Sequence, residues 1–537
     1  MKNKFSAQFY PLLLRTPLSN LFIDKKVTNK IINNFNDPWN GDLDTGYKIL
    51  KGYMTFFGET VHFKNSIWSK NQATNIWNNE LQSFGWVKDL RLVGSNQARI
   101  FLRKAIKEWL DKHKNWSKVE WKSNILAKRI CNLLGNFSFF CSSAEESFKE
   151  VFLRSISKQS AHLISYKMRD VDGFEKIFAI KTIILTSLSF ETLQRYFHYG
   201  ESLLINEISN QINSDGSHFL KSPGIHFEFL KNLIDIKNMY SKTKREVPET
   251  INSTIENMGS ILKFYRHGSG SLATFNNTKP VKKFQIDQVL LRANSKIKVP
   301  NFSPFTGFQK VSENKLNFIM DCGNPVKEEP YAGSLSFELS SGKNLIIVNC
   351  GSPHIQNRKW AEAMKSSAAH STLSIDNVNS SDIFFGSQKK GRIAKVWSKK
   401  SSDGHCYWID SAHNGYKNIF GVIHNRKIHI DPQKKIIRGQ DTIVKSVEKY
   451  SLNPKKIFIR FHVHPNVDAN VTGSRRKVIL RLANGKGWEF ICSEPIIKIC
   501  ESIYLASDQG ITRNSHILLS NKVLNNKKIN WIFREIN

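Results

Sequence analysis

The spacing of apolar residues changes near residue 270, and this change constrains the fold more than any other feature of the sequence. Before it, apolar side chains recur at helical spacing, as in QARIFLRKAIKEWLDKH (97–113), where they fall on one face of a helix. FEKIFAIKTIILTSLSF (174–190) is apolar nearly all round, which predicts a helix buried between other helices. The first half of the chain is therefore expected to be an array of helices.

After residue 270 the period becomes two, which is the period of β-strands. SLSFEL (334–339) places its large apolar residues on alternate positions, so they share one face of a strand. VILRLANGKGWEF (478–490) contains an Asn-Gly pair that suits a type I′ turn, which predicts a hairpin. Successive strands with short turns predict antiparallel sheets stacked as a sandwich.

The composition shift also divides the chain into four expected parts. YRHGSGSLATFNNTKP (265–280) is rich in Gly, Ser, Asn and Pro, as connecting segments are. We expect an N-terminal extension, a helical domain, a linker and an antiparallel β-sandwich over residues 1–60, 61–268, 269–284 and 285–537. The predicted fold class is a multidomain α+β protein.

The net charge favours negatively charged partners. The chain has 79 Lys and Arg against 45 Asp and Glu, a formal net charge of +34, and such a field attracts polyanions. The alternative is a sequence rich in Lys, Asn and Ile everywhere, with no meaning for binding. Because the lysines are dispersed and no nucleic-acid-binding module is present, we expect no nucleic acid partner.

Other features exclude further classes of protein. No stretch approaches the roughly 20 apolar residues that a membrane helix needs. The N-terminal apolar run FYPLLL (9–14) is too short for a signal peptide. The seven cysteines are scattered without a Cys-x-x-Cys pair, so neither a disulfide framework nor a zinc finger is expected.

Six motifs occur together in one order along the chain. They are WNNELQSFGWVKDLR (77–91), DGSHFLKSPGIHFEFLKNL (215–233), SLSFELSSGKNLIIVNCGSP (334–353), AAHSTLSIDNVNSS (368–381), SAHNGY (411–416) and IRFHVHP (459–465). Over roughly residues 70–530 this set resembles the heparinase II/III-like family of polysaccharide lyases. The resemblance implies an incomplete α/α toroid followed by an antiparallel β-sandwich. It also implies eliminative cleavage of a uronate-containing polysaccharide in a cleft between the two domains.

The chemistry that the resemblance implies has definite requirements. The uronate carboxylate must be neutralised, a Tyr or His must remove the C5 proton, and another group must protonate the leaving oxygen. The family uses an Asn or His on a toroid helix, a Tyr on a later helix and a His in the sandwich. This chain has no Asn-His pair near Gly173–Glu175. It has Ile225 where the family has Tyr, and Glu329 and Tyr331 where the family has His-x-His-x-Asp.

Four residues are the predicted catalytic candidates. His218 and His226 flank a loop that ends at a helix N-terminus, where they could face a substrate or simply be surface histidines of a turn. His370 begins a strand where the family also has His, and the alternative is a structural histidine. Tyr331 could serve as a phenolic acid or base, or pack as an ordinary aromatic residue.

Six further residues are predicted to bind substrate. Arg129 and Asn132 are three apart and share a helix face, where the arginine could clasp a carboxylate or be a buried structural group. His413 lies in SAHNGY, where the family has His-Asp-Gly-Tyr. A sugar-contacting surface is predicted for the remaining three, with ordinary core as the alternative for the tryptophans: Gln82, Trp86 and Trp121.

Two patterns could suggest a metal, and neither supports one. In KIFIRFHVHP (456–465) the polar residues Arg460, His462 and His464 alternate with apolar ones. Two histidines on a strand chelate a metal only with a third ligand, so the polar side of a sandwich sheet explains the pattern with fewer assumptions. At the family's zinc positions stand Tyr331, Asn349 and His370, and we expect neither zinc nor another cofactor.

Two functions follow from the sequence. The first is a lyase that cleaves an acidic polysaccharide by β-elimination. The alternative is a catalytically inactive glycan-binding or envelope polysaccharide assembly protein on the same scaffold. In both, the expected partner is an acidic polysaccharide. The resemblance places the protein in the cell envelope or periplasm, although without a clear signal peptide the cytoplasm remains open. The sequence makes no prediction of the oligomeric state.

Overall fold

The computed structural model describes residues 27–113, 119–166, 170–352, 358–383, 391–446, 452–493, 497–507 and 510–536. The N-terminal run considered as a signal peptide lies outside these ranges. The chain divides into two compact units. We call Met1–Gln211 with Glu228–Ile255 the helical unit, and Ile212–Phe227 with Glu256–Asn537 the sandwich unit.

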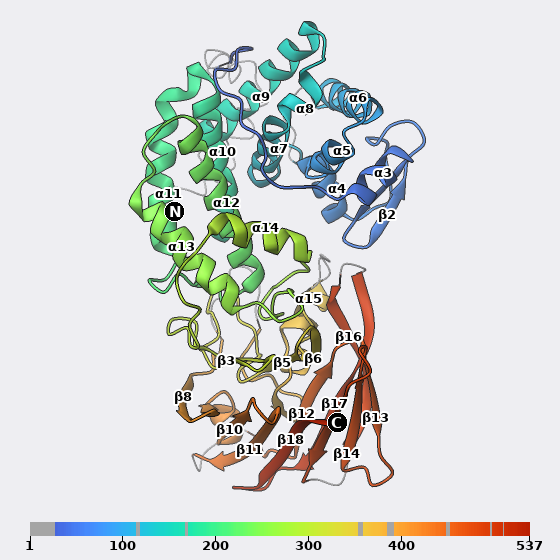
Figure 1. The fold of residues 1–537 in the computed structure, drawn as a ribbon, viewed down its shortest axis with the longest axis vertical. Helices are drawn as coiled ribbons and strands as arrows, with labels where there is room; N and C mark the ends of the chain where they lie inside the picture. The colour runs from blue at the N-terminus through green and yellow to red at the C-terminus, as the bar shows by residue number, and fades with distance from the viewer. Residues whose placement is uncertain are drawn as a thin grey trace. The chain divides into compact units, whose positions relative to one another are not determined.

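The N-terminal half of the chain is helical, as the periodicity predicts (Figure 1). Its elements are α3 (Leu43–Leu50), β1 (Tyr53–Phe56), β2 (Glu59–His62), α4 (Asn75–Ser83), α5 (Val87–Val93), α6 (Asn96–Lys112), α7 (Ser123–Gly135), α8 (Phe137–Cys141), α9 (Glu146–Tyr166), α10 (Lys176–Ser189), α11 (Phe197–Gln211), α12 (Pro223–Lys242), α13 (Glu249–Phe264) and α14 (Lys283–Ala293). Helix α6 buries the face predicted from its spacing, and α10 is buried nearly all round. Within the described ranges, each helix is too short or too polar to cross a bilayer.

Two antiparallel sheets form the C-terminal half of the chain. The first has the order β16 (Ile497–Ser507), β17 (Gly510–Lys522), β12 (Lys456–Val463), β6 (Asn344–Val348), β5 (Phe337–Ser341), β4 (Leu316–Asp321) and β3 (Phe308–Glu313), and β7 (Leu373–Ile375) also pairs with β12. The second has the order β13 (Val467–Val471), β14 (Lys477–Leu482), β15 (Gly487–Cys492), β18 (Lys528–Ile536), β11 (Ile436–Lys445), β10 (Val422–Asp431), β9 (Cys406–His413) and β8 (Val396–Asp403). Two short helices, α15 (Arg358–Lys365) and α16 (Lys417–Phe420), lie between strands.

The predicted hairpin at 478–490 is present as β14 and β15, but its turn is not type I′. That turn needs positive φ at both central residues. Gly485 has φ +83°, whereas Asn484 is not among the residues with positive φ. The single left-handed residue is the glycine that closes a longer turn, so the sequence identified the hairpin and misassigned the turn.

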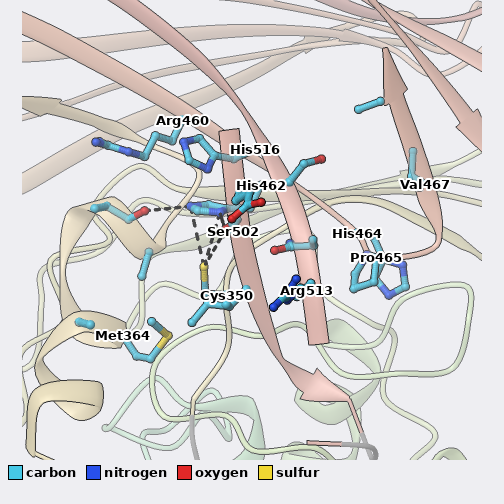
Figure 2. Close-up of a pocket in the computed structure, with 18 of the residues that line it drawn as sticks. Cys350, Met364, Arg460, His462, His464, Pro465, Val467, Ser502, Arg513 and His516 are labelled. Atoms are coloured by element: carbon cyan, nitrogen blue, oxygen red, sulfur yellow. Dashed lines mark hydrogen bonds between the residues drawn. The ribbon is translucent and has the colours of Figure 1, made fainter. Parts of the chain in front are cut away.

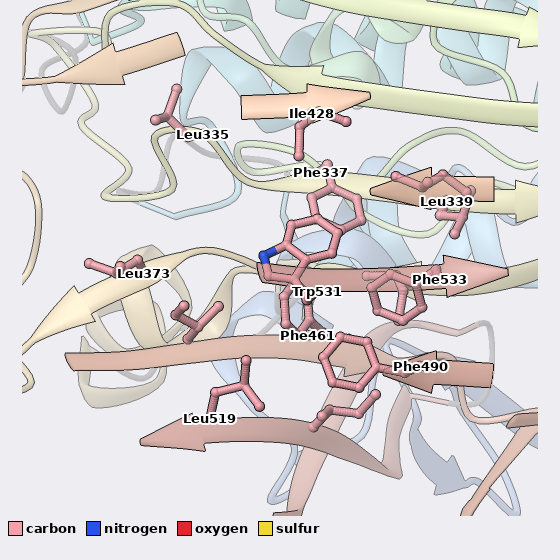
Figure 3. Close-up of a cluster of buried hydrophobic side chains, with 14 of the residues drawn as sticks. Leu335, Phe337, Leu339, Leu373, Ile428, Phe461, Phe490, Leu519, Trp531 and Phe533 are labelled. Atoms are coloured by element: carbon pink, nitrogen blue, oxygen red, sulfur yellow. The ribbon is translucent and has the colours of Figure 1, made fainter. Parts of the chain in front are cut away.

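A core of aromatic side chains packs the two sheets against each other (Figure 3). Phe337 and Phe461 come from the first sheet, and Trp531 and Phe533 come from the second. The Trp531 ring centroid lies 4.9 Å from that of Phe461 and 5.6 Å from that of Phe337. Gly439 is required beside this core, because a Cβ there would lie 2.1 Å from the Trp531 ring.

A fully buried polar network lies behind the aromatic core. Arg426 donates through Nε and a terminal nitrogen to the two carboxylate oxygens of Asp441, at 2.8 and 3.0 Å. His424 donates from Nε2 to Asp441 at 2.7 Å and accepts at Nδ1 from His413 Nε2 at 3.1 Å. The His413 Nδ1 accepts from Gly415 N at 3.1 Å. Both imidazoles are therefore neutral, and burial lowers the pKa of each.

We predict that Asp441→Ala destabilises the protein by about 3–5 kcal/mol, because it leaves Arg426 buried without its counter-ion. Urea unfolding followed by tryptophan fluorescence measures this loss. Asp410→Ala is the matched control, since Asp410 pairs with Lys427 at 3.5 Å with more than half of its side chain exposed, and such pairs contribute little. Equal unfolding midpoints for the two variants would contradict the prediction.

Candidate functional site

His218 lies in a loop and His226 in the first turn of α12; both belong to the sandwich unit, and hydrogen bonds hold the loop in place. Asp215 Oδ1 accepts from Ser217 N at 2.9 Å, and Asp215 Oδ2 accepts from Ser303 Oγ at 2.7 Å. Gly216 has φ +84°, and a Cβ there would lie 2.5 Å from the Asn257 backbone. Pro223 then starts α12, where a missing N–H costs nothing. The loop is a rigid feature of the fold.

The two histidines point into the protein. His218 is 1% exposed and His226 is 0% exposed. Burial lowers the pKa of His218 to about 3 and that of His226 to about 4. His226 Nε2 donates to Met258 O at 2.8 Å, and Leu220 N donates to His218 Nδ1 at 3.2 Å. Both rings are neutral, and neither reaches the surface.

A buried ion pair that the sequence did not predict connects this loop to β4. Lys221 has φ +55°, and its Nζ donates to Asp321 Oδ1 at 2.7 Å and to Asn324 O at 3.1 Å. Asn276 Nδ2 donates to Lys221 O at 2.9 Å. Lys221 stands inside a quoted motif, but no spacing in the sequence could have paired it with a residue 100 positions away.

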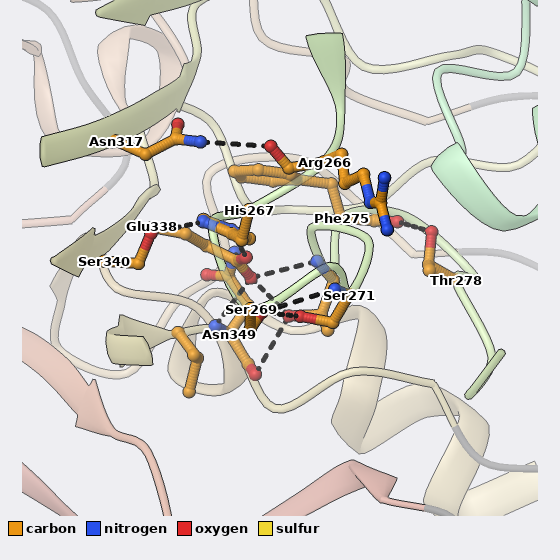
Figure 4. A network of polar contacts seen from close by, with 12 residues as sticks. Arg266, His267, Ser269, Ser271, Phe275, Thr278, Asn317, Glu338, Ser340 and Asn349 are labelled. Atoms are coloured by element: carbon orange, nitrogen blue, oxygen red, sulfur yellow. Dashed lines mark hydrogen bonds and ion pairs between the residues drawn. The ribbon is translucent and has the colours of Figure 1, made fainter. Parts of the chain in front are cut away.

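The glycine-rich segment 265–280 is packed against the first sheet (Figure 4). His267 contacts Ser340 Oγ through Nδ1 at 2.9 Å and Glu338 Oε2 through Nε2 at 3.0 Å. Glu338 Oε1 also accepts from Thr274 N and Asn349 N, both at 3.1 Å. This network fixes the position of the residues that follow it, Asn276 and Asn277, next to the predicted catalytic Tyr331.

Tyr331 lies in a cluster of polar side chains, which we call the Tyr331 cluster. Lys365 Nζ is 3.3 Å from Glu329 Oε1 and 5.2 Å from the Tyr331 ring centroid. Asn277 joins the cluster by accepting from Ser352 Oγ at 2.9 Å. Tyr331 is 8% exposed, and burial, together with the Glu329 charge, raises the pKa of its phenol well above the ordinary value. The phenol is therefore a poor base at neutral pH.

His370 adjoins the Tyr331 cluster, with ring centroids 6.3 Å apart and planes nearly perpendicular. Its Nδ1 donates to Ser366 O at 2.7 Å, which leaves Nε2 as the basic nitrogen. Gly333 lies against the ring, where a Cβ would approach Cδ2 to 2.5 Å and Nε2 to 2.9 Å. Of the four predicted catalytic residues, the fold thus brings Tyr331 and His370 together, and His370 is 4% exposed.

The residues at the family's zinc positions do not fit zinc. Asn349 Oδ1 accepts from Ser371 N at 3.0 Å, and its Nδ2 donates to Glu338 at 3.2 Å, so the side-chain amide is fully occupied. Tyr331 is a neutral phenol and offers no strong ligand. Over the part of the chain that the structure describes, no three His, Cys, Asp or Glu side chains gather as metal ligands would.

The substrate-binding residues predicted in the helical half make hydrogen bonds within the helical unit or are buried there, while Asn132 and Gln82 keep some exposure. Arg129 is 0% exposed and donates to Gln159 Oε1 and Glu120 O at 2.9 and 2.8 Å. Asn132 Nδ2 donates to Ser83 O at 2.8 Å. The other three contact groups of the helical unit or are buried in it: Gln82 accepts from Trp109 Nε1, Trp86 donates to Leu81 O, and Trp121 is 6% exposed. His413, predicted in the sandwich, is part of the buried Asp441 network.

The alternating segment 457–464 forms one wall of a pocket of about 780 Å³, which we call the His462 pocket (Figure 2). Ile459, Phe461 and Val463 face the sandwich core, as the alternation predicts. Arg460, His462 and His464 face the other way and line the pocket. The pocket therefore lies on the outer side of the first sheet, beside β16 and β17.

The imidazole at the centre of the pocket is held in one orientation. His462 Nε2 donates to Ala368 O at 2.9 Å, and its Nδ1 accepts from Ser502 Oγ at 2.9 Å. Cys350 Sγ lies 3.5 Å from Nδ1, but burial raises the pKa of that thiol to about 12. Ala368 is two residues before His370, so the same segment connects this pocket to the Tyr331 cluster.

The pocket presents groups that suit a polar, charged ligand. Arg513 and Ser515 line it beside His516. Asn514 donates from Nδ2 to Val463 O at 2.8 Å, while its Oδ1 is buried and has no hydrogen-bond partner within the described ranges. Two guanidinium groups, of Arg460 and Arg513, line the pocket together with the carboxylates of Asp468 and Glu501, and a guanidinium can bind a carboxylate or sulfate.

Two family models together match most of the chain. The model described as the heparinase II/III N-terminus matches residues 74–297. The model described as heparinase II/III-like, C-terminal, matches residues 299–532.

Relatives and solved structures agree with these matches. FtsZ-localized protein C of Caulobacter vibrioides is 25% identical over 91% of this chain and 87% of its own length. The heparin-sulfate lyase of Pedobacter heparinus is 24% identical over 39% of this chain and 33% of its own length. The crystal structure of heparinase III aligns over 100% of this chain and 92% of its own, at 14% identity and a TM-score of 0.70. The predicted fold class, an α/α toroid followed by an antiparallel β-sandwich, is confirmed.

The buried neutral histidines predict that acid destabilises the protein. Their pKa values lie below the ordinary 6.5, at about 4 for His226, His464 and His516. Below pH 6.5 the unfolded chain binds protons that the folded chain cannot. Each ring then costs up to about 1.4 kcal/mol per pH unit until the folded pKa is reached. We expect urea midpoints to fall steeply from pH 6.5 to about pH 4.

A single substitution tests the source of this acid lability. His226→Gln should make the free energy of unfolding less dependent on pH, because one proton fewer is taken up on unfolding. His405→Gln is the control and should not change the slope, because more than half of the His405 side chain is exposed. If the urea midpoint of the wild type were the same at pH 7 and pH 5, the acid lability would not come from buried neutral histidines.

Proposed function

Because this chain belongs to the heparinase II/III-like family, we propose that it binds an acidic polysaccharide without cleaving it. One observation carries the proposal: the candidate acids and bases are sealed inside the sandwich unit. His226 is 0% exposed, His370 is 4% exposed, and Ile225 stands where the resemblance places the catalytic tyrosine. A base must come within hydrogen-bond reach of the proton that it removes, and these groups are covered.

The proton chemistry of the site also favours binding over elimination. The Tyr331 phenol has a raised pKa, which disfavours the phenolate that would serve as base. His226 uses Nε2 to donate to a backbone carbonyl, and His370 is 4% exposed. Removing the C5 proton requires an accessible base beside a neutralised carboxylate, and this combination is not assembled around these residues.

The His462 pocket supports the binding half of the proposal. Arg513 offers planar, paired donors of the kind that recognise carboxylate and sulfate. Arg460, whose terminal nitrogens donate to Ser374 and Asn377, adds a second positive charge. The charge of +34 raises the encounter rate with any polyanion. We place an acidic sugar unit in this pocket, with the envelope as the compartment where such polymers occur.

The relatives also favour binding of a polysaccharide without cleavage. The relative that spans 91% of this chain is named for localisation with FtsZ and not for an activity, whereas the lyase relative spans 39%. A binding protein with the fold of a lyase fits these two coverages, because a fold can be kept when the catalytic activity is not.

A lyase remains the second candidate, and the Tyr331 cluster favours it. Lys365 lies beside both Glu329 and the Tyr331 ring. A lysine ammonium next to a phenol can stabilise phenolate, which would make Tyr331 the base in a rearranged site.

We predict that the purified protein releases no unsaturated uronate from heparin, heparan sulfate, alginate, hyaluronan or chondroitin, yet binds at least one of them. Ultraviolet absorbance of the conjugated product and calorimetric titration measure the two properties separately. Tyr331→Phe and His370→Ala should leave binding unchanged. Product formation that both variants abolish would establish the lyase candidate instead.

We further predict that Arg513→Gln weakens binding of the recognised polysaccharide by about 10-fold or more, as loss of a charged hydrogen bond does. Arg481→Gln is the matched control, because Arg481 is an exposed arginine on β14 of the other sheet. If the two variants bind alike, the His462 pocket is not the site.

A further inference from the structure

We infer that the outer face of the second sheet is a separate docking surface for an extended acidic polysaccharide chain. This inference rests on the proposed function and deepens it. The surface, which we call the Trp397–Trp408 face, is formed by side chains of β8, β9, β10, β11 and β18. Its exposed or half-buried outward polar and aromatic residues include Trp397, Lys399, Ser401, Asp403, Trp408, Asp410, Asn425, Lys427, His429, Arg438, Gln440, Thr442, Lys528, Asn530 and Arg534.

Two tryptophans are exposed on this face, where large apolar side chains are costly. Trp397 is 49% exposed and Trp408 is 37% exposed. Trp408 lies opposite Ser401, four residues along β8 from Trp397. At about 3.3 Å per strand residue the two indoles are about 13 Å apart along the strands. Tryptophan is enriched at interaction surfaces, because its large apolar ring also carries a polar N–H.

The tryptophans form part of a row of rings and cations across the strands. His429 lies opposite Trp408, with ring centroids 5.0 Å apart. Arg438 lies opposite His429 on the next strand. The indole and the imidazole offer flat faces for the C–H side of a sugar ring, and the guanidinium beside them can bind a carboxylate or sulfate.

The charge of the face is complementary to an acidic polymer. Lys399, Lys427, Arg438 and Lys528 are all exposed, and the exposed carboxylates on the same face are Asp410 and, at the end of β8, Asp403. Asp410 lies between two of these lysines, opposite Lys399 on β8 and Lys427 on β10. The excess of positive charge on an open surface attracts polyanions and makes binding sensitive to salt.

The polar groups on the neighbouring strands β10, β11 and β18 favour a sugar polymer over a bilayer. Gln440 Nε2 donates to Asn530 Oδ1 at 2.8 Å, and Thr442 lies opposite Asn425. Amides and hydroxyls both donate and accept, as sugar hydroxyls require. A membrane-inserting surface would need a continuous apolar patch, whereas here the two indoles are separated by Lys399 and Asp410.

This face and the His462 pocket lie on different sheets of the sandwich. The pocket is on the outer side of the first sheet, and the tryptophans are on the outer side of the second. Each surface would bind its own stretch of polymer, and two sites on one protein raise the affinity for long chains by avidity.

The experiment compares immobilised heparin with a heparin-derived disaccharide, using wild type, Trp397→Ala/Trp408→Ala, and Phe305→Ala. The double variant should bind heparin at least about 10-fold more weakly while its disaccharide affinity is unchanged. Phe305 is 58% exposed and lies outside the face, so its variant controls for losing an exposed aromatic residue. Heparin affinity of the double variant equal to that of wild type overturns the inference.

A second variant and two other ligands separate the remaining outcomes. Lys399→Gln/Lys427→Gln keeps both indoles and should flatten the salt dependence of heparin binding. If instead the tryptophan variant loses binding to phosphatidylglycerol vesicles or duplex DNA while heparin binding stays intact, the face serves another polyanion and the inference is wrong. If wild type binds no acidic polysaccharide at all, the proposed function itself fails.

Discussion

The buried guanidinium of Arg426 is the interaction on which the rest of the sandwich unit depends. On one side it is neutralised by Asp441 in the second sheet. On the other it donates to Leu335 O and Ser371 O at 2.9 and 3.0 Å. Those carbonyls belong to the segments that carry Tyr331 and His370. A single ion pair therefore connects the aromatic core with the Tyr331 cluster.

That connection explains why the cluster is closed. A buried ion pair is tolerated only when its remaining donors are satisfied, and Arg426 satisfies them with backbone carbonyls next to the candidate residues. The same segment supplies Ala368 O to His462. His370 and His462 are both buried, and burial lowers the pKa of each imidazole.

The charged and polar side chains that could contact a ligand lie on the outer surfaces of the sandwich. The first sheet carries the His462 pocket with its two arginines, and the second carries exposed indoles among lysines and amides. Both surfaces follow from strand alternation, because each strand that buries one set of side chains must present the next set outward. The fold of a polysaccharide lyase family thus presents two polar surfaces, one on each sheet, at which we propose that an acidic polysaccharide binds.

Much of this could be predicted from local sequence patterns. The change in period near residue 270 predicted helices followed by an antiparallel sandwich. The alternation in KIFIRFHVHP separated core residues from pocket residues, and Asn484-Gly485 marked a hairpin. These predictions held because burial on one side of a helix or strand leaves a periodic pattern that the sequence records directly. The turn type was missed, because it depends on the backbone angle of one residue.

Tertiary structure alone decided what the polar residues do. Arg129 and His413 have the residue types of a binding site, yet the fold places the first inside a helical core and the second in a buried network. Lys221 pairs with Asp321, 100 residues away. Whether a histidine is a base or a satisfied donor depends on which carbonyls and backbone atoms surround its two nitrogens. Those neighbours come from distant parts of the chain, and no local pattern encodes them.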